Sequence, residues 1–128
     1  MKIIVINEDE LERRHACWGI HSRSHEYQVL AITHQRNICK YLVEHDNRLD
    51  WWDADLFLLV DNTIPSEWVE VHLKKHQKFQ NPKYDFDISI SYYRGPTAFW
   101  DNKNFFFDIY ENPSVAYEFY RQTVGNSI

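Results

Sequence analysis

Glycine, proline and cysteine are scarce: the 128 residues include three glycines, four prolines and two cysteines. No Gly-x-Gly-x-x-Gly, Gly-x-x-x-x-Gly-Lys or Gly-x-Ser-x-Gly pattern occurs, which argues against phosphate-cradling loops and a hydrolase nucleophile elbow. Cys17 and Cys39 lie far apart in a chain without an export signal, so we expect reduced thiols rather than a disulfide framework.

Long hydrophobic runs and excess positive charge are also missing. No segment approaches the roughly 18 apolar residues that a membrane span requires, and the apolar run 2–6 is too short for a signal sequence. The net charge of −5 argues against nucleic acid as a direct ligand, because phosphate binding needs a basic stripe. We therefore expect a cytoplasmic protein that contacts neither membrane nor nucleic acid.

The composition is otherwise that of a globular protein, with 44% hydrophobic and 16% aromatic residues. A chain of this length fits one domain, so residues 1–128 are expected to form a single unit. The apolar patterns predict an α+β fold, with a mainly antiparallel sheet of about four to five strands and about three packed helices.

Strands are expected at residues 2–6, 56–60, 84–93, 97–100 and 105–111, the last three forming a meander. Helices are expected at 24–45 and 113–124, and between Pro65-Ser66 and Asn81-Pro82, with a short one near 8–14. Residues 46–53 are interpreted as a loop. Two alternatives stay open, namely a strand at 27–33 followed by a helix, and a strand in place of the helix after Ser66.

Several side chains are given a direction by these elements. Along 84–93, Ile88, Ile90 and Tyr92 should face the core, with the intervening residues facing water. A strand at 105–111 would turn Phe106 away from Phe105 and Phe107, under a covering helix. The last helix should begin at Pro113, after the capping residue Asn112, and pack four residues on the sheet: Ala116, Tyr117, Tyr120 and Val124.

Negative charge is concentrated in residues 44–70, which hold eight carboxylates and one base, Arg48. The segment therefore carries −7, and the rest of the chain +2, which suggests a cationic partner. Trp51 and Trp52 lie within it and should point in opposite directions, so that one can pack inward while the other contacts a partner. The predicted partner-binding residues are Asp46, Asp50, Trp51, Trp52, Asp53, Asp55, Asp61, Glu67 and Glu70.

Catalytic patterns are weaker. His72 and His76 have the spacing of zinc ligands on a helix, but a third ligand is missing and Leu73 stands where a zincin has glutamate. Asp53 and Asp55 would share one face of an extended chain and could hold a divalent cation. A small metal-dependent hydrolase using these residues is the alternative function; otherwise we expect no catalytic residue, metal or cofactor.

Three phrases resemble small bacterial immunity proteins of contact-dependent growth inhibition systems: residues 60–68 (VDNTIPSEW), 90–96 (ISYYRGP) and 106–113 (FFDIYENP). The resemblance implies a cytosolic, non-enzymatic domain that binds and blocks the toxic C-terminal domain of a large effector, commonly a nuclease. The expected mechanism is occlusion, in which the carboxylates of residues 44–70 pair with basic side chains of the toxin. The oligomeric state stays open, including a homo-oligomer that uses the phenylalanine-rich segment.

Overall fold

The computed structural model describes residues 1–15, 25–80, 83 and 86–124, apart from the side chains of residue 15 and residues 74–77. The α+β prediction is confirmed. The elements are β1 (Lys2–Val5), α1 (Glu8–His15), β2 (Glu26–Gln28), β3 (Ala31–Gln35), β4 (Ile38–His45), β5 (Arg48–Asp53), the 3-10 turn η1 (Ala54–Leu56), β6 (Phe57–Asp61), β7 (Val69–Phe79), β8 (Ile88–Gly95), α2 (Thr97–Asp101), α3 (Lys103–Glu111) and α4 (Pro113–Thr123).

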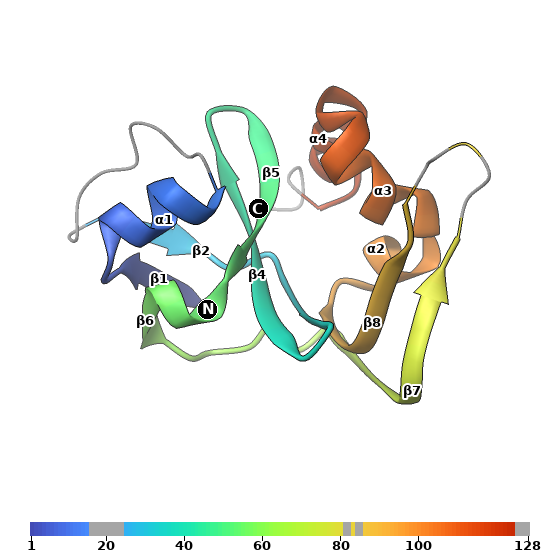
Figure 1. Ribbon diagram of the computed structural model, residues 1–128, viewed down its shortest axis with the longest axis horizontal. Helices are drawn as coiled ribbons and strands as arrows, with labels where there is room; N and C mark the ends of the chain where they lie inside the picture. Colours follow the sequence, from blue (N-terminus) through green and yellow to red (C-terminus); the bar gives the residue numbers. More distant parts are fainter. Residues whose placement is uncertain (16–24, 81–82, 84–85, 125–128) are drawn as a thin grey trace.

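The strands form two antiparallel sheets. Sheet A has the order β2-β1-β6, and sheet B has the order β5-β4-β3-β8-β7. Figure 1 shows β4 and β5 between two groups of elements, with α1, β1, β2 and β6 on one side and α2, α3 and α4 on the other. One end of sheet B is therefore covered on both faces.

Two hydrophobic clusters share strands β4 and β5. Because side chains alternate along a strand, Leu42 and Trp51 enter the cluster beneath the helices, whereas Val43 and Trp52 enter the cluster beneath sheet A. The first cluster also contains the phenylalanines of α2 and α3, and the second contains the inward face of β1. The hairpin β4–β5 thus belongs to both cores.

Two tight hairpins replace the helix expected at 24–45 and the loop expected at 46–53, so both predictions are wrong. Arg36 and Asn37 join β3 to β4, and Asp46 and Asn47 join β4 to β5, with φ values of 51°, 66°, 47° and 59°. Two consecutive residues with positive φ are the type I′ turn that matches the twist of a hairpin. The alternative strand at 27–33 is partly right, because β2 and β3 overlap it, but β4 occupies the place of the helix that was to follow.

Strands β7 and β8 form the other end of sheet B. The strand alternative for residues after Ser66 is confirmed by β7, and the helix is wrong; Asn81-Pro82 and residues 84 and 85 lie outside the described residues. The strand expected at 84–93 is confirmed from Ile88 onward. Its alternation changes face after Ile90, where the register shifts, so that Tyr93 rather than Tyr92 is fully buried.

Residues 97–100 and 105–111 form helices α2 and α3, so the predicted strands and meander are wrong. Phe105, Phe106 and Phe107 are all buried, because α3 lies between sheet B and neighbouring helices. Phe106 contacts Trp51, whereas Phe105 stacks on Phe99 of α2. Helix α4 begins at Pro113 and buries Ala116 and Tyr120, as predicted.

Candidate binding surface

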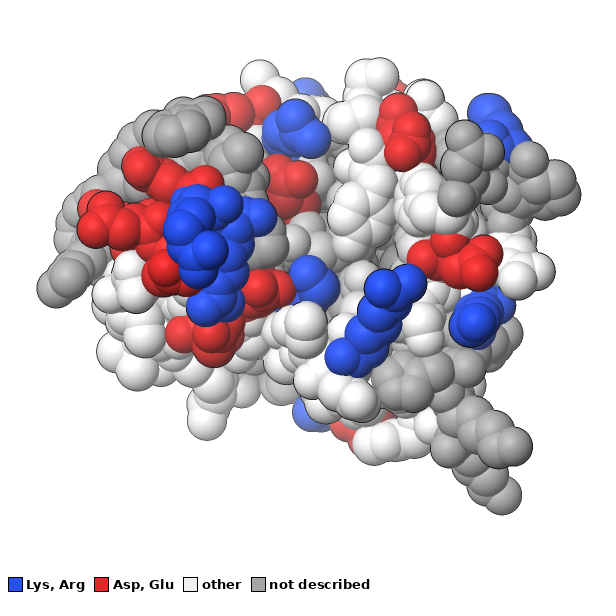
Figure 2. All heavy atoms as spheres, viewed as in Figure 1, with Lys and Arg blue, Asp and Glu red and all other residues white. Residues whose placement is uncertain are grey.

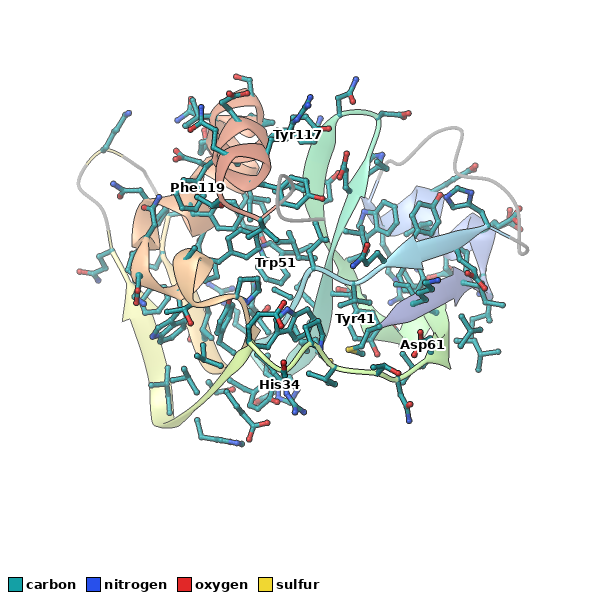
Figure 3. All side chains as sticks on the ribbon, turned by 180° about the vertical axis from the view of Figure 1, so that it is seen from behind. His34, Tyr41, Trp51, Asp61, Tyr117 and Phe119 are labelled. Atoms are coloured by element: carbon teal, nitrogen blue, oxygen red, sulfur yellow. The ribbon has the colours of Figure 1, made fainter. Side chains whose placement is uncertain are left out.

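The two tryptophans point in opposite directions, as predicted, but both are buried. Trp51 is 4% exposed and lies parallel to Phe106, with ring centroids 6.2 Å apart. Trp52 is 0% exposed and lies parallel to Phe57 at 5.6 Å. Figure 3 shows Trp51 in the interior, between the helices and the strands. The prediction that one indole is available to a partner is wrong, because β5 lies between two cores rather than in a loop.

Asp53 and Asp55 are held together by cations of the same chain. The Arg14 Nη1 atom lies 3.3 Å from Asp53 Oδ2 and 2.9 Å from Asp55 Oδ1. Lys40 Nζ contacts the other Asp53 oxygen at 3.0 Å. Hydrogen bonds from Arg13 and Arg14 also lower the pKa of Glu10 to about 2. Figure 2 shows basic side chains among acidic ones on this side of the molecule, and the fold thus neutralises much of the local negative charge.

Two further predicted residues are engaged within the sheets. Asp50 accepts a hydrogen bond from His45 and lies 3.5 Å from Arg48 Nε. Glu70 contacts His72 Nε2 at 2.8 Å and accepts a hydrogen bond from the Tyr92 hydroxyl at 3.0 Å. The His72 hydrogen bond, followed by that of Tyr92, lowers the pKa of the Glu70 carboxyl. The prediction that the acidic segment presents unpaired carboxylates to a partner is therefore wrong for Asp50, Asp53 and Glu70, because each contacts side chains of its own chain.

The histidine pair also loses its expected geometry. Residues 72 and 76 belong to strand β7, so the helical spacing on which the zinc prediction depends is absent, and the side chain of residue 76 lies outside the described residues. In the part of the chain that the structure describes, no group of three or more His, Cys, Asp or Glu residues could hold a metal ion. Cys17 lies outside the described residues.

The remaining exposed part of the acidic segment is strand β6. Leu58, Leu59 and Val60 are 52%, 41% and 45% exposed, contrary to the buried strand predicted at 56–60. Strand β6 is at an edge of sheet A, where β1 is its only neighbour among the described strands. Asp55 precedes the strand with its side chain 65% exposed, and Asp61 ends it. Figure 3 shows Asp61 on this outer strand, on the side of the molecule away from α2, α3 and α4.

The pairing with β1 explains the exposure of Leu58. Phe57 lies opposite Val5 and faces the core, so Leu58, opposite Ile4, faces outward. Ile3 pairs with Leu59, but the next residue of β1, Lys2, pairs with Asp61 instead of Val60. This irregularity interrupts the alternation of side chains at Val60. A continuous apolar run usually predicts a buried strand, so sequence reasoning had no signal for this surface.

The start of helix α1 completes the surface. Ile6 is 46% exposed and donates its backbone N–H to the Leu56 carbonyl at 2.9 Å. A hollow of about 270 Å³ is lined by Ile6, Asn7, Glu8 and Asp9. We define the β6 edge surface as the four apolar residues and the acids near them in these elements: Ile6, Leu58, Leu59, Val60, Glu8, Asp9, Asp55 and Asp61.

Asp46 and Glu67 remain exposed outside this surface, with the Asp46 side chain 83% exposed.

No family model, curated protein or solved structure significantly matches the chain. Within the described ranges, no helix has the length and apolar character needed to cross a bilayer. A function for this chain must therefore be inferred from the exposure, charge and contacts of its own residues.

Proposed function

We propose that this chain is a protein-binding inhibitor of the immunity type, and that the β6 edge surface binds the toxic domain it neutralises. One observation carries this proposal: three consecutive large apolar side chains are exposed on an edge strand. Such an edge favours uncontrolled association unless another surface covers it. Binding to a partner would bury these side chains and would explain why they are exposed in the free protein.

The carboxylates beside the strand favour a basic partner. Asp61 ends β6, and Glu8 and Asp9 line the hollow beside Ile6, whereas Asp55, which precedes the strand, is already paired with Arg14. A nuclease domain, with lysines and arginines that hold phosphates, has the complementary charge. Inhibition would occur by occlusion in the cytoplasm, without catalysis, metal or cofactor.

The exposed fractions set the size of the apolar contribution. Burying a whole Leu or Val side chain contributes about 1.5–3 kcal/mol, so burying the exposed half of three such side chains contributes on the order of 3 kcal/mol. Nanomolar binding requires about −12 kcal/mol. Charge pairs and backbone hydrogen bonds along the free edge must supply the remainder, as in complexes where a partner strand extends a sheet.

Growth protection provides the test. The C-terminal domain of the protein encoded immediately upstream is expressed in a bacterial host, with or without this chain. The unaltered chain should restore growth, and the double variant Leu58→Lys, Val60→Lys should not, because two cations would face a basic partner. Val115→Lys is the matched control, since Val115 is 54% exposed on α4, outside this surface.

Three results would count against the proposal. The upstream domain could be harmless to the host, the chain could fail to protect, or the double variant could protect as well as the control does. Circular dichroism of both variants shows whether they remain folded. Light scattering separates a further outcome, in which the β6 edge pairs with a second copy and the double variant converts a dimer to a monomer.

A further inference from the structure

A second apolar site lies at the junction of the β3–β4 turn, the start of β8 and the end of α3. A pocket of about 420 Å³ opens there, and its apolar walls include Ile38, Phe86, Ile88 and Tyr110. Ile38 and Tyr110 are 47% and 45% exposed, which places two more large apolar side chains in contact with water. The volume is within the range of small-molecule sites, and the pocket shares no residue with the β6 edge surface.

Hydrogen bonds and ring contacts hold these walls in place. The buried Gln35 side chain donates to Thr33 Oγ1 at 2.8 Å and accepts from the Tyr110 hydroxyl at 3.3 Å. Phe86 contacts the Tyr110 ring edge-on at 5.9 Å and the Phe107 ring at 5.5 Å. Although the residue is 45% exposed, desolvation of the Tyr110 hydroxyl, followed by the charge of Asp50, raises its pKa to about 12, so the hydroxyl stays neutral. The pocket is therefore pre-formed rather than dependent on a ligand.

Charges of both signs line the same pocket. Arg36 comes from the hairpin turn, Asp87 precedes β8, and Glu111 ends α3. None of these three exposed side chains makes a hydrogen bond or ion pair with any residue that the structure describes. Lys40 also lines the pocket, but Asp53 already pairs with it at 3.0 Å. One cation and two anions thus face the pocket without contacting each other.

The backbone at Arg36 gives independent support. Its φ of 51° is in the left-handed region, which is unfavourable for most residues and which glycine or asparagine adopts more readily. A long cationic side chain is a poor choice for the turn alone. At functional sites such a cost is offset by what the side chain does.

We propose that this pocket binds a small zwitterion with a large apolar side chain, of which an apolar α-amino acid is the simplest example. The side chain would fill the space between Ile38, Phe86 and Tyr110. Its carboxylate would face Arg36, and its ammonium group would face Glu111 or Asp87. A ligand with only negative charge would meet two unpaired carboxylates, and one with only positive charge would meet an unpaired guanidinium.

Three related probes test the charge requirement by calorimetric titration of the whole chain. L-phenylalanine carries both charges, L-phenylalanine amide only the positive one, and N-acetyl-L-phenylalanine only the negative one, at pH 6, where α-amino groups remain protonated. L-phenylalanine should bind about tenfold more tightly than either analogue, because a hydrogen bond to a charged group is worth at least that factor.

Charge-removing variants then locate the site. Arg36→Gln should remove the advantage of phenylalanine over its amide, and the double variant Asp87→Asn, Glu111→Gln should remove its advantage over the N-acetyl form. Arg121→Gln and Glu118→Gln, on α4 and outside the pocket lining, are the controls and should change neither ratio.

The proposal is overturned if no probe shows saturable binding or if the three probes bind alike. It is also overturned if the pocket variants leave the affinity ratios unchanged. These results are independent of toxin inhibition, because the growth assay depends on residues of β6 and not on this pocket.

Discussion

Replacement of Trp52 tests the two-core architecture most directly. The side chain is 0% exposed and contacts Phe57, Tyr27 and His45, with ring centroids at 5.6, 5.5 and 4.9 Å. Truncating such a residue to alanine removes its burial and leaves a cavity, at a cost of about 3–5 kcal/mol. Domains of this size are stable by about 5–15 kcal/mol, so Trp52→Ala should remove a large part of the free energy of unfolding.

Phenylalanine at the same position should be far better tolerated. Burial of the indole N–H groups of Trp51 and Trp52 leaves both without a hydrogen-bond partner in the described part of the chain. An unsatisfied buried donor costs about 1–3 kcal/mol, which phenylalanine removes. This gain offsets the roughly 1 kcal/mol lost with the smaller apolar surface, so Trp52→Phe should unfold within about 1 kcal/mol of the unaltered chain.

Urea unfolding followed by far-ultraviolet circular dichroism measures both changes without relying on tryptophan emission. Trp51→Ala and Trp51→Phe provide the matched pair in the other core, where the same ranking is expected. A cost below about 1 kcal/mol for Trp52→Ala would show that the residue is not in a packed core. Equal costs for the alanine and phenylalanine variants would show that the N–H has a partner, and would refute the reasoning from its burial.

Three further predictions concern the turn, the ion pairs and the edge strand. Arg36→Gly should raise the free energy of unfolding by roughly 0.5–1 kcal/mol, by relieving the φ of 51°; a lower urea midpoint would contradict this. Because the pKa of Glu10 falls from 4.5 to about 2 on folding, its stabilisation is present above pH 4.5 and lost towards pH 2. Thermal melts of Glu10→Gln should therefore approach those of the unaltered chain at acid pH, and a constant gap would contradict it. Leu58→Lys with Val60→Lys should change stability by less than about 0.5 kcal/mol, since both side chains are exposed; a larger loss in urea unfolding would place them in the core.

The sequence predicts correctly those helices and strands whose local propensity and capping residues favour the same structure that tertiary packing favours. Strand β1, the short helix α1 and the capped helix α4 follow from a β-branched run, an ordered charge pattern and the Asn112-Pro113 start. The hairpins β3–β4 and β4–β5 were missed because their turns lack glycine. Without a turn signal, apolar residues at three- and four-residue steps favour a helix over two short strands.

Helix α3 was missed for a different reason. A run of three phenylalanines suits a strand by propensity and obscures the helical periodicity, although α3 buries residues 105–107 and 109 and leaves Tyr110 and Glu111 exposed. The acidic segment was identified correctly as a charge feature. The prediction that this segment forms an unpaired acidic surface fails because its carboxylates pair with bases that are distant in sequence. Arg14, for example, pairs with Asp53 and Asp55, and composition alone cannot reveal such a contact.

The position of β5 has a consequence for how the molecule melts. Trp51 and Trp52 are neighbours on one backbone, yet each anchors a separate core, so neither core can be lost without displacing a residue of the other. Elements that share such an anchor unfold as one cooperative unit. Differential scanning calorimetry should therefore record one endotherm, with equal calorimetric and van't Hoff enthalpies, rather than successive melting of the two halves.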